Sequence, residues 1–285
     1  MFRLLHLLPK NLVSHTIGQV VHSRLPFGIH RTVRDWFIRN YKIDCSEAEK
    51  PVAAYETLGD FFVRQLKPGA RPIESATMVS PVDGTLTQMG RFQGGPAGGG
   101  AAKLTQIKGL DYSLEELAGP GWELNEYRDR GGYMTIYLAP YNYHRIHSPI
   151  QGHITQVTYI PGALWPVNTW SVSHIPGLFV VNERIAVEIA SPAGKVLLVM
   201  VGATNVGRIT LDFYDGIAGN QRPRSRERVW RPSQPLPVEK GQGIGCFELG
   251  STVILALTPG LMDQVDPALA GSLPSVVRMG QGLAP

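Results

Sequence analysis

Three kinds of side chain that together can carry out acyl chemistry stand out in this chain. Ser251 follows a glycine near the C-terminus, and Asp83 precedes a glycine in the first third of the chain. His144 and His147, three residues apart, lie between Asp83 and Ser251 in the chain. A serine hydroxyl is a poor nucleophile at neutral pH, so it needs an imidazole base, which a carboxylate can orient. These four residues are the parts of a serine-nucleophile site.

Each of these residues also has an ordinary structural interpretation. A Gly-Ser pair is common in strands, and an Asp-Gly pair commonly forms a turn. Histidines in a loop are often exposed or held in structural hydrogen bonds. No further His or Cys stands near enough in sequence to His144 and His147 to suggest a metal site. Taken alone, the inventory leaves both interpretations open.

The segment around Ser251 alternates like one continuous strand over 247–257. Every second residue points to one face, which is apolar apart from the Ser251 hydroxyl. Gly250 has no side chain to pack, and glycine in a strand often marks a close approach of the backbone. The nearest electrophile to Ser251 is therefore the carbonyl of Gly250. Because no GxSxG elbow surrounds the serine, an outside substrate would reach it with difficulty.

Asp83 and the two histidines are expected in irregular backbone next to strands. Residues 79–86 predict a strand, a turn at Asp83 and a second strand. A strand over 133–138 runs into a proline-bracketed segment that carries His144 and His147. Positions three apart in a regular strand face opposite ways, so only a turn could bring both imidazoles to one cavity.

The rest of the chain predicts an α+β protein that is mainly β, with a turn-rich sheet or barrel-like catalytic domain after N-terminal amphipathic helices. A helix is expected over 51–66, and the glycine-rich tract 93–102 is expected to be a loop because it lacks a phosphate-binding motif. Further strands, separated by Pro and Gly turns, are expected over 153–160, 179–189, 196–201 and 207–213.

Composition narrows the class of protein. The chain has 285 residues, of which 43% are hydrophobic and 18% charged, as in folded globular proteins. Cys45 and Cys246 form no CxxC pair, which suits a reducing compartment. No helix-turn-helix, zinc-finger or RNP-like motif is present, so the sequence does not indicate nucleic-acid binding.

The basic charge is concentrated at the N-terminus. Residues 1–42 contain seven Lys and Arg and one Asp, a net +6, whereas the whole chain carries +4. Short amphipathic helices over 2–41, broken at Pro9 and Pro26, are expected there. No apolar run approaches the ~18 residues of a transmembrane helix, and no secretory signal is recognisable. This segment is either a helical cap on the core or an interfacial membrane segment, and we favour the second.

Ordered blocks of sequence over about 55–260 carry a family resemblance. They are FVRQLKPGARPI (62–73), SPVDG (80–84), KG (108–109), YSLEEL (112–117), YHRIHSP (143–149), PGAL (161–164), VN (167–168), NER (182–184), VGAT (201–204) and LGST (249–252). With these blocks in this order, the chain resembles the bacterial phosphatidylserine decarboxylases, which are pyruvoyl-dependent enzymes made as self-cleaving precursors.

The resemblance implies that the chain cuts itself between Gly250 and Ser251. Ser251 would attack the carbonyl of Gly250, with His147 as the base and Asp83 orienting it. The ester would break by β-elimination and leave a pyruvoyl group at position 251. The products would be a β chain, 1–250, and an α chain, 251–285, which pair as a heterodimer. A further association into a dimer of heterodimers is left open.

For the mature enzyme, the resemblance implies decarboxylation of phosphatidylserine to phosphatidylethanolamine through a Schiff base with the pyruvoyl group. His144 is the candidate proton donor, and Leu164, Val167 and Asn168 are candidate substrate contacts. No metal and no pyridoxal phosphate are implied. Residues 1–54 would form the membrane-association segment and 55–285 the catalytic domain, attached peripherally to the cytoplasmic side of the cell membrane.

Three other functions remain open at this point. A serine hydrolase acting on outside substrates would use the same three residue types. A membrane-attached binding module is conceivable because the glycine-rich strands near the C-terminus resemble a lipoyl-type barrel. A pyruvoyl decarboxylase for a soluble amino acid would share the self-cleavage but would not need residues 1–42 for membrane binding.

Overall fold

The computed structural model describes residues 20–24, 28–93, 102–106, 110–204, 208–219, 226–248 and 251–284. Much of the N-terminal region in which helices were expected over 2–41 lies outside the described residues, as do most of the glycine-rich tract, the block 108–109, Leu249 and Gly250. Among the residues described, no helix is both long and apolar enough to cross a bilayer.

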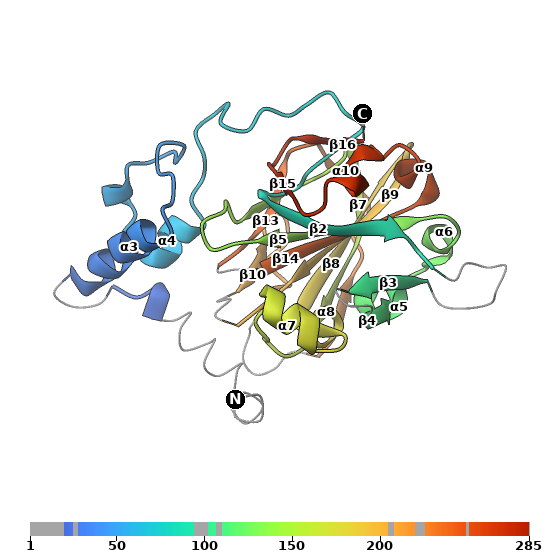
Figure 1. The fold of residues 1–285 in the computed structure, drawn as a ribbon, viewed down its shortest axis with the longest axis horizontal. Coiled ribbons are helices and arrows are strands. Elements are labelled where there is room, and N and C mark those ends of the chain that lie inside the picture. The colour runs from blue at the N-terminus through green and yellow to red at the C-terminus, as the bar shows by residue number, and fades with distance from the viewer. Residues whose placement is uncertain are drawn as a thin grey trace.

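A nine-stranded antiparallel sheet forms the body of the molecule (Figure 1). The mainly β architecture expected from the sequence is confirmed. Eight strands follow one another in the order β11 (Arg228–Trp230), β7 (Gly152–Ile160), β8 (Arg184–Ser191), β9 (Gly194–Val201), β14 (Ser251–Leu257), β5 (Gly132–Leu138), β2 (Gly84–Arg91) and β15 (Ser275–Val277), and β12 (Leu236–Val238) also pairs with β7.

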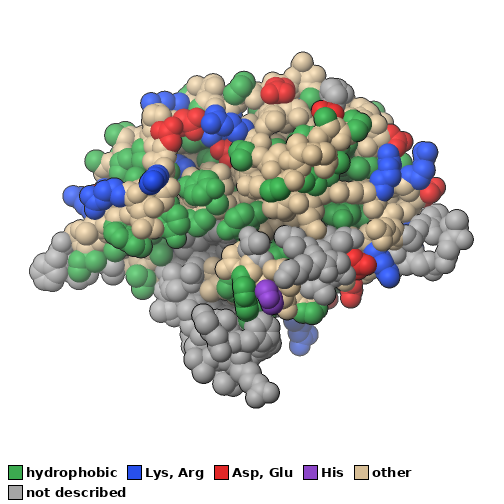
Figure 2. Space-filling model, viewed as in Figure 1, with side chains coloured by type: hydrophobic (Ala, Val, Ile, Leu, Met, Phe, Trp, Pro, Cys, Tyr) green, Lys and Arg blue, Asp and Glu red, His purple; other side chains and the backbone are tan. Residues whose placement is uncertain are grey.

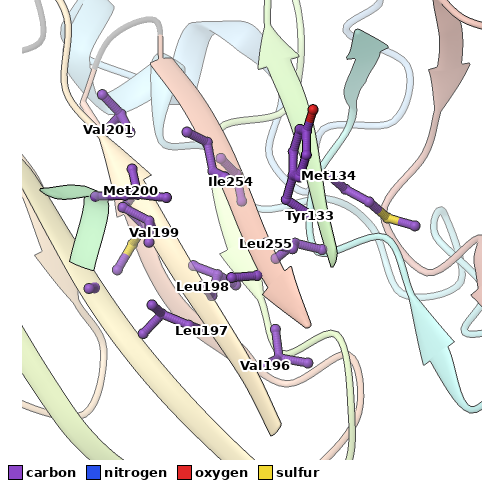
Figure 3. Close-up of a cluster of buried hydrophobic side chains, with 14 of the residues drawn as sticks. Tyr133, Met134, Val196, Leu197, Leu198, Val199, Met200, Val201, Ile254 and Leu255 are labelled. Carbon is purple, nitrogen blue, oxygen red and sulfur yellow. The ribbon is translucent and has the colours of Figure 1, made fainter. Parts of the chain in front are cut away.

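Strands β9 and β14 lie in the centre of this sheet and are buried on both faces. All seven residues of β14 are buried, as are the last six of β9. Their side chains pack across the strands in pairs such as Leu255 with Leu198 and Ile254 with Val199 (Figure 3). Full burial of each such side chain contributes roughly 1.5–3 kcal/mol. The apolar runs of these strands therefore hold the middle of the sheet together.

The strand predicted over 247–257 is two strands in two different sheets. Strand β13 (Gly243–Phe247) pairs with β6 (Arg145–His147) and β10 (Ile209–Leu211) in a three-stranded sheet, whereas β14 pairs with β5 and β9. The prediction of one continuous strand was wrong because apolar periodicity does not reveal which partner a residue bonds. Ser251 is therefore the first residue of its strand.

The strand–turn–strand prediction for 79–86 is correct in its elements but does not form a hairpin. Strand β1 (Met78–Val79) pairs with β16 (Gly282–Ala284), and β2 pairs with β5 and β15. Ser80 donates its hydroxyl to the carbonyl of Val82 across the turn at 2.8 Å. The turn thus carries Asp83 from one sheet to the next.

The N-terminal region forms a second, smaller hydrophobic cluster at one end of the molecule (Figure 1). Its elements are α3 (Ile29–Asn40), a short 3-10 helix, η2 (Val52–Ala54), and α4 (Leu58–Phe62). The single helix predicted over 51–66 is thus two short helices, because Thr57 and Asp60 form a capping box that begins α4 anew at Leu58. The cluster includes Phe61 and Phe62, so it extends past residue 54.

Shorter elements complete the fold. The first part of the strand expected over 179–189 is helical (α8, Leu178–Val181), because Gly177 adopts a positive φ and opens a short helix before β8 begins. The strand expected over 207–213 is limited to β10. The remaining elements are β3 (Lys103–Gln106), β4 (Leu110–Ser113), α5 (Leu114–Ala118), α6 (Asn125–Arg128), α7 (Thr169–His174), α9 (Pro259–Met262) and α10 (Ala268–Gly271).

Candidate functional site

Ser251 is completely buried where β14 begins. It pairs with Leu138 at the end of β5, so its position is set by the sheet. Within the described part of the chain, its Oγ has no hydrogen-bond partner. Burying an unpaired hydroxyl costs about 1–3 kcal/mol, and native structures contain few such groups. An unpaired, rigidly placed hydroxyl is suited to act as a reagent.

His144 is fully buried and neutral. Its Nδ1 lies 2.8 Å from the carbonyl of Asn142, and because a carbonyl can only accept, Nδ1 carries the proton. Its Nε2 therefore has a lone pair, and no described residue donates to it. The ring packs on Phe62 of α4 with 4.1 Å between ring centres. Burial lowers the pKa of His144 to about 3, so this nitrogen is available as a proton acceptor at neutral pH.

His147 is held through both ring nitrogens. Nδ1 donates to the carbonyl of Gly241 at 2.7 Å, which leaves the lone pair on Nε2 to accept from the Tyr143 hydroxyl at 3.0 Å. Burial lowers the pKa of His147 below its ordinary value. The imidazole is therefore neutral at neutral pH and able to accept a proton. The rings of His144 and His147 share none of these partners.

Asp83 is bound mainly by Arg71. The Arg71 Nε lies 2.9 and 3.2 Å from the two carboxylate oxygens, and the backbone N–H of Met279 donates to one of them at 2.9 Å. These bonds occupy the carboxylate, and no hydrogen bond joins Asp83 to His147 among the described contacts. The two residues are nevertheless neighbours, because the N–H of His147 donates to the carbonyl of Pro81 at 2.9 Å. The charge of Asp83 also raises the pKa of His147, against the larger effect of burial.

A cavity of about 210 Å³ is lined by residues that contact His144 or adjoin Ser251, whereas Asp83 lines a separate cavity with Arg71 and Tyr143. The first cavity reaches the buried groups through Phe62, which packs on His144, and through Tyr137, which pairs with Thr252 next to Ser251. Its lining comes from five parts of the chain: Phe37, Tyr41, Phe62, Tyr137, Pro140, Pro166, Val167, Asn168, Ala203 and Thr204.

Two of the three substrate contacts predicted from the sequence line this cavity, namely Val167 and Asn168. Leu164 does not; it is buried, and its carbonyl accepts from the Thr204 hydroxyl. The sequence interpretation missed Tyr137, which lies in a strand expected only to be structural. It also gave no individual role to Phe62, Ala203 or Thr204, although all three belong to the blocks quoted above.

Asn182 fixes the wall that carries Val167 and Asn168. Its side-chain amide donates to the carbonyls of Trp165 and Gly202 at 2.9 and 2.8 Å, and its Oδ1 accepts from the N–H of Trp165 at 3.0 Å. One buried amide thus ties the loop after β7 to the end of β9. The block NER at 182–184 has a structural role in placing the cavity wall.

Comparison with known proteins identifies the family. A model of the phosphatidylserine decarboxylase family matches residues 58–284. The chain is 43% identical over 283 residues to the phosphatidylserine decarboxylase proenzyme of Anaeromyxobacter sp. (strain K), covering 98% of this chain and 95% of that protein. It is 38% identical over 289 residues to the proenzyme of Shewanella sp. (strain ANA-3), with 98% and 94% covered. The proenzyme of Myxococcus xanthus (strain DK1622) is 39% identical over 259 residues, with 90% and 89% covered.

The chain therefore belongs to the phosphatidylserine decarboxylase family, and its enzyme class is that of the carboxy-lyases. The family match begins at Leu58, the first residue of α4, and ends within β16. It contains all four candidate catalytic residues and the turn, strands and cavity wall that position them.

The ion pair between Arg71 and Asp83 gives the first testable prediction. Their side chains are only 7% and 9% exposed, so Arg71→Ala leaves a buried, unpaired carboxylate. We expect a loss of roughly 3–5 kcal/mol in the free energy of unfolding, measured by urea denaturation. The control is Arg91→Ala, which breaks a pair with Asp263 whose side chains are 47% and 45% exposed; it should cost less than about 1 kcal/mol. Equal losses in both variants would contradict this account.

Proposed function

We propose that this chain is a phosphatidylserine decarboxylase made as a precursor that cuts itself between Gly250 and Ser251. The observation that supports this most directly is the buried and unpaired hydroxyl of Ser251 at the first position of β14. Buried hydroxyls usually have a hydrogen-bond partner. Those of Thr135, Thr252 and Ser275 are also unpaired among the described residues, but of these four only Ser251 directly follows a glycine. Its nearest electrophile along the chain is the preceding peptide carbonyl.

Self-cleavage follows from the chemistry of these two residues. The Oγ of Ser251 attacks the carbonyl carbon of Gly250, and the peptide C–N bond breaks as an ester forms and the amine of residue 251 is released. Elimination across the Cα–Cβ bond of residue 251 then breaks the ester, leaving a carboxylate on Gly250. The dehydroalanine that remains takes up water and loses ammonia to become a pyruvoyl group. The β chain is 1–250 and the α chain 251–285, and the two remain associated.

His147 is the base in this step, and its lowered pKa keeps it unprotonated at neutral pH. It takes the serine proton at Nε2, the nitrogen that faces the Tyr143 hydroxyl. The hydrogen bond to the Gly241 carbonyl favours the imidazolium that forms, and the charges of Asp212 and Asp83 favour it more weakly, because each raises the pKa of His147. General-base assistance of this kind is worth ~10²–10⁴-fold in rate.

The pyruvoyl group would supply a ketone that condenses with the substrate amine and accepts the electron pair released with CO₂. The site fits such a group, because position 251 is fully buried and adjoins the cavity wall at Tyr137. His144 transfers the proton that the decarboxylated carbon needs. Its free Nε2 can pass a proton on to the carbon that loses CO₂, because a pKa of about 3 makes the neutral ring a weak base and the protonated ring a strong acid. A histidine with a pKa of about 3 has no proton to give until it has received one.

The size of the cavity supports a lipid substrate handled at a membrane. A volume of about 210 Å³ accommodates a head group but not two acyl chains. Removing roughly 30 methylenes from the bilayer, at ~0.8 kcal/mol each, would be prohibitive. The acyl chains therefore remain in the bilayer while the serine head group enters, and the product is phosphatidylethanolamine.

Two exposed tryptophans flank the cavity and suit such an attachment. On α3, Ile29, Val33 and Trp36 form an exposed apolar stripe, and Trp36 adjoins the cavity residue Phe37. On the opposite wall, Trp170 of α7 is 47% exposed. Basic and hydrophobic side chains gather at the α3 end of the molecule (Figure 2). We infer peripheral attachment to the cytoplasmic side of the cell membrane through this surface.

The mass of the mature chains tests self-cleavage. The wild-type protein should yield two fragments, and the C-terminal fragment should carry a pyruvoyl group in place of Ser251. Ser251→Ala should remain full length, because it has no nucleophile. Cleavage at 250 in Ser251→Ala, or a full-length wild-type chain that is active as a decarboxylase, would contradict the mechanism.

The role of His144 can be separated from maturation. His144→Ala should still be cleaved at Gly250, whereas release of CO₂ from phosphatidylserine should fall at least ~10²-fold. In the wild type, titration of His144 should cause no loss of turnover until the pH approaches about 3, since its imidazole stays neutral above that value. Normal turnover by the processed variant would remove His144 from the proton-transfer step.

The membrane surface is tested with charge substitutions. Trp36→Glu and Trp170→Glu should each weaken binding to anionic phosphatidylserine vesicles in a sedimentation assay, because a carboxylate opposes both burial and anionic lipid. Val276→Glu is the control, since Val276 is 75% exposed on β15. Its vesicle binding should equal that of the wild type. Equal binding by all three variants would place the attachment elsewhere.

A further inference from the structure

His22 forms an ion pair with the chain segment that leads to Ser251. Its Nε2 lies 3.1 Å from Oε2 of Glu248, and the two side chains are 34% and 19% exposed. Glu248 follows β13, and its N–H donates to the carbonyl of Arg208 at 2.9 Å. The pair therefore joins the N-terminal segment to the chain three residues before the nucleophile.

The ring of His22 also packs directly on α4. A Cβ placed on Gly59 would lie 2.3 Å from two atoms of this ring, so a larger residue at position 59 would displace the ring. The same short helix carries Phe62, which packs on His144. His22 is thus wedged between the helix that supports one catalytic histidine and the segment that precedes Ser251.

We propose that the pair of His22 and Glu248 is a clamp that positions the chain before Ser251 for self-cleavage. It makes maturation depend on correct seating of the N-terminal segment, the part of the chain that we assign to the membrane. This inference rests on the proposed self-cleavage. His22 and Glu248 act through the backbone of the segment, so they are positioning residues.

The charges around His22 make the clamp dependent on pH. The pKa of His22 is raised, first by its hydrogen bond to Glu248; burial opposes this, and the charges of Glu248 and Asp60 support it. Arg24, on the same segment, is paired with Glu56. Because the folded pKa lies above 6.5, the stabilisation is complete below that value and is lost as the pH rises through the raised pKa.

His147 and His22 therefore limit the rate of cleavage at opposite ends of the pH range. His147 must be unprotonated to act as the base, so the rate of cleavage falls as the pH decreases through the lowered pKa of His147. His22 must be protonated, and its raised pKa places a second limb on the alkaline side. The rate of cleavage should follow a bell-shaped pH profile, whose alkaline limb belongs to His22.

The test follows cleavage of the full chain after a short pulse of cell-free synthesis, chased in buffers from about pH 5 to 9.5 and read on gels. His22→Gln and Glu248→Gln should be cut about tenfold more slowly than the wild type at neutral pH, a change of about 1.4 kcal/mol in the barrier. His22→Lys should keep the neutral rate but lose the alkaline limb, because lysine stays charged to about pH 10.

The matched control is Arg24→Gln, which removes a cation from the same segment. The side chains of Arg24 and Glu56 are 73% and 50% exposed, so this variant should be cleaved like the wild type at every pH. Melting temperatures separate loss of the clamp from loss of the fold. Once processed, the His22→Gln and Glu248→Gln enzymes should release CO₂ at the wild-type rate, since the clamp acts before maturation.

Wild-type cleavage rates in His22→Gln, or an unchanged alkaline limb in His22→Lys, would overturn the clamp alone. If His22→Gln fails to fold, the alkaline limb of His22→Lys decides the question. A wild-type chain that is never cut would overturn the proposed self-cleavage and the clamp with it. The two failures are therefore distinguishable in one experiment.

Discussion

Strand β14 is hydrogen-bonded on both sides, to β5 and to β9, and the rest of the site depends on this double pairing. The pairing with β5 covers all seven residues of β14, from Ser251 opposite Leu138 to Leu257 opposite Gly132. The apolar side chains on both faces are removed from water, which makes the strand costly to displace. The first residue of such a strand has a fixed position, and here that residue is Ser251. Strand β13, which ends at Phe247, belongs to another sheet, so consecutive strands on the two sides of the proposed cleavage site have different partners.

The burial that places Ser251 also sets the chemistry of its neighbours. Removal from water disfavours the charged form of an imidazole, and the pKa values of His144 and His147 are both lowered for this reason. Two neutral histidines are suited to accept protons. Their Nδ1 atoms donate to the carbonyls of Asn142 and Gly241, which leaves the lone pairs on Nε2. The same physical effect thus keeps both histidines neutral, the one proposed to act in maturation and the one proposed to act in turnover.

The N-terminal cluster brings membrane attachment and catalysis together. Helix α3 exposes Trp36 and lines the cavity with Phe37, while α4 packs Phe62 on His144. A single small unit therefore carries the proposed membrane surface, lines the cavity and contacts His144, the residue proposed for proton transfer. His22 adds a contact from this unit to the segment before Ser251. This arrangement gives a physical reason for a lipid enzyme to build its membrane segment into its active site.

The sequence by itself determined the residue types of the site, the strands at 133–138, 153–160 and 196–201, and the family, because these depend on local pattern and on the order of motifs. Only the tertiary structure decided that β13 and β14 lie in different sheets, that Arg71 binds Asp83, and that Gly241 orients His147. It also brought Phe62, Tyr137 and Thr204 to one cavity. Periodicity records which face of an element is apolar, but a hydrogen bond or a cavity wall between distant segments depends on which elements become neighbours when the chain folds.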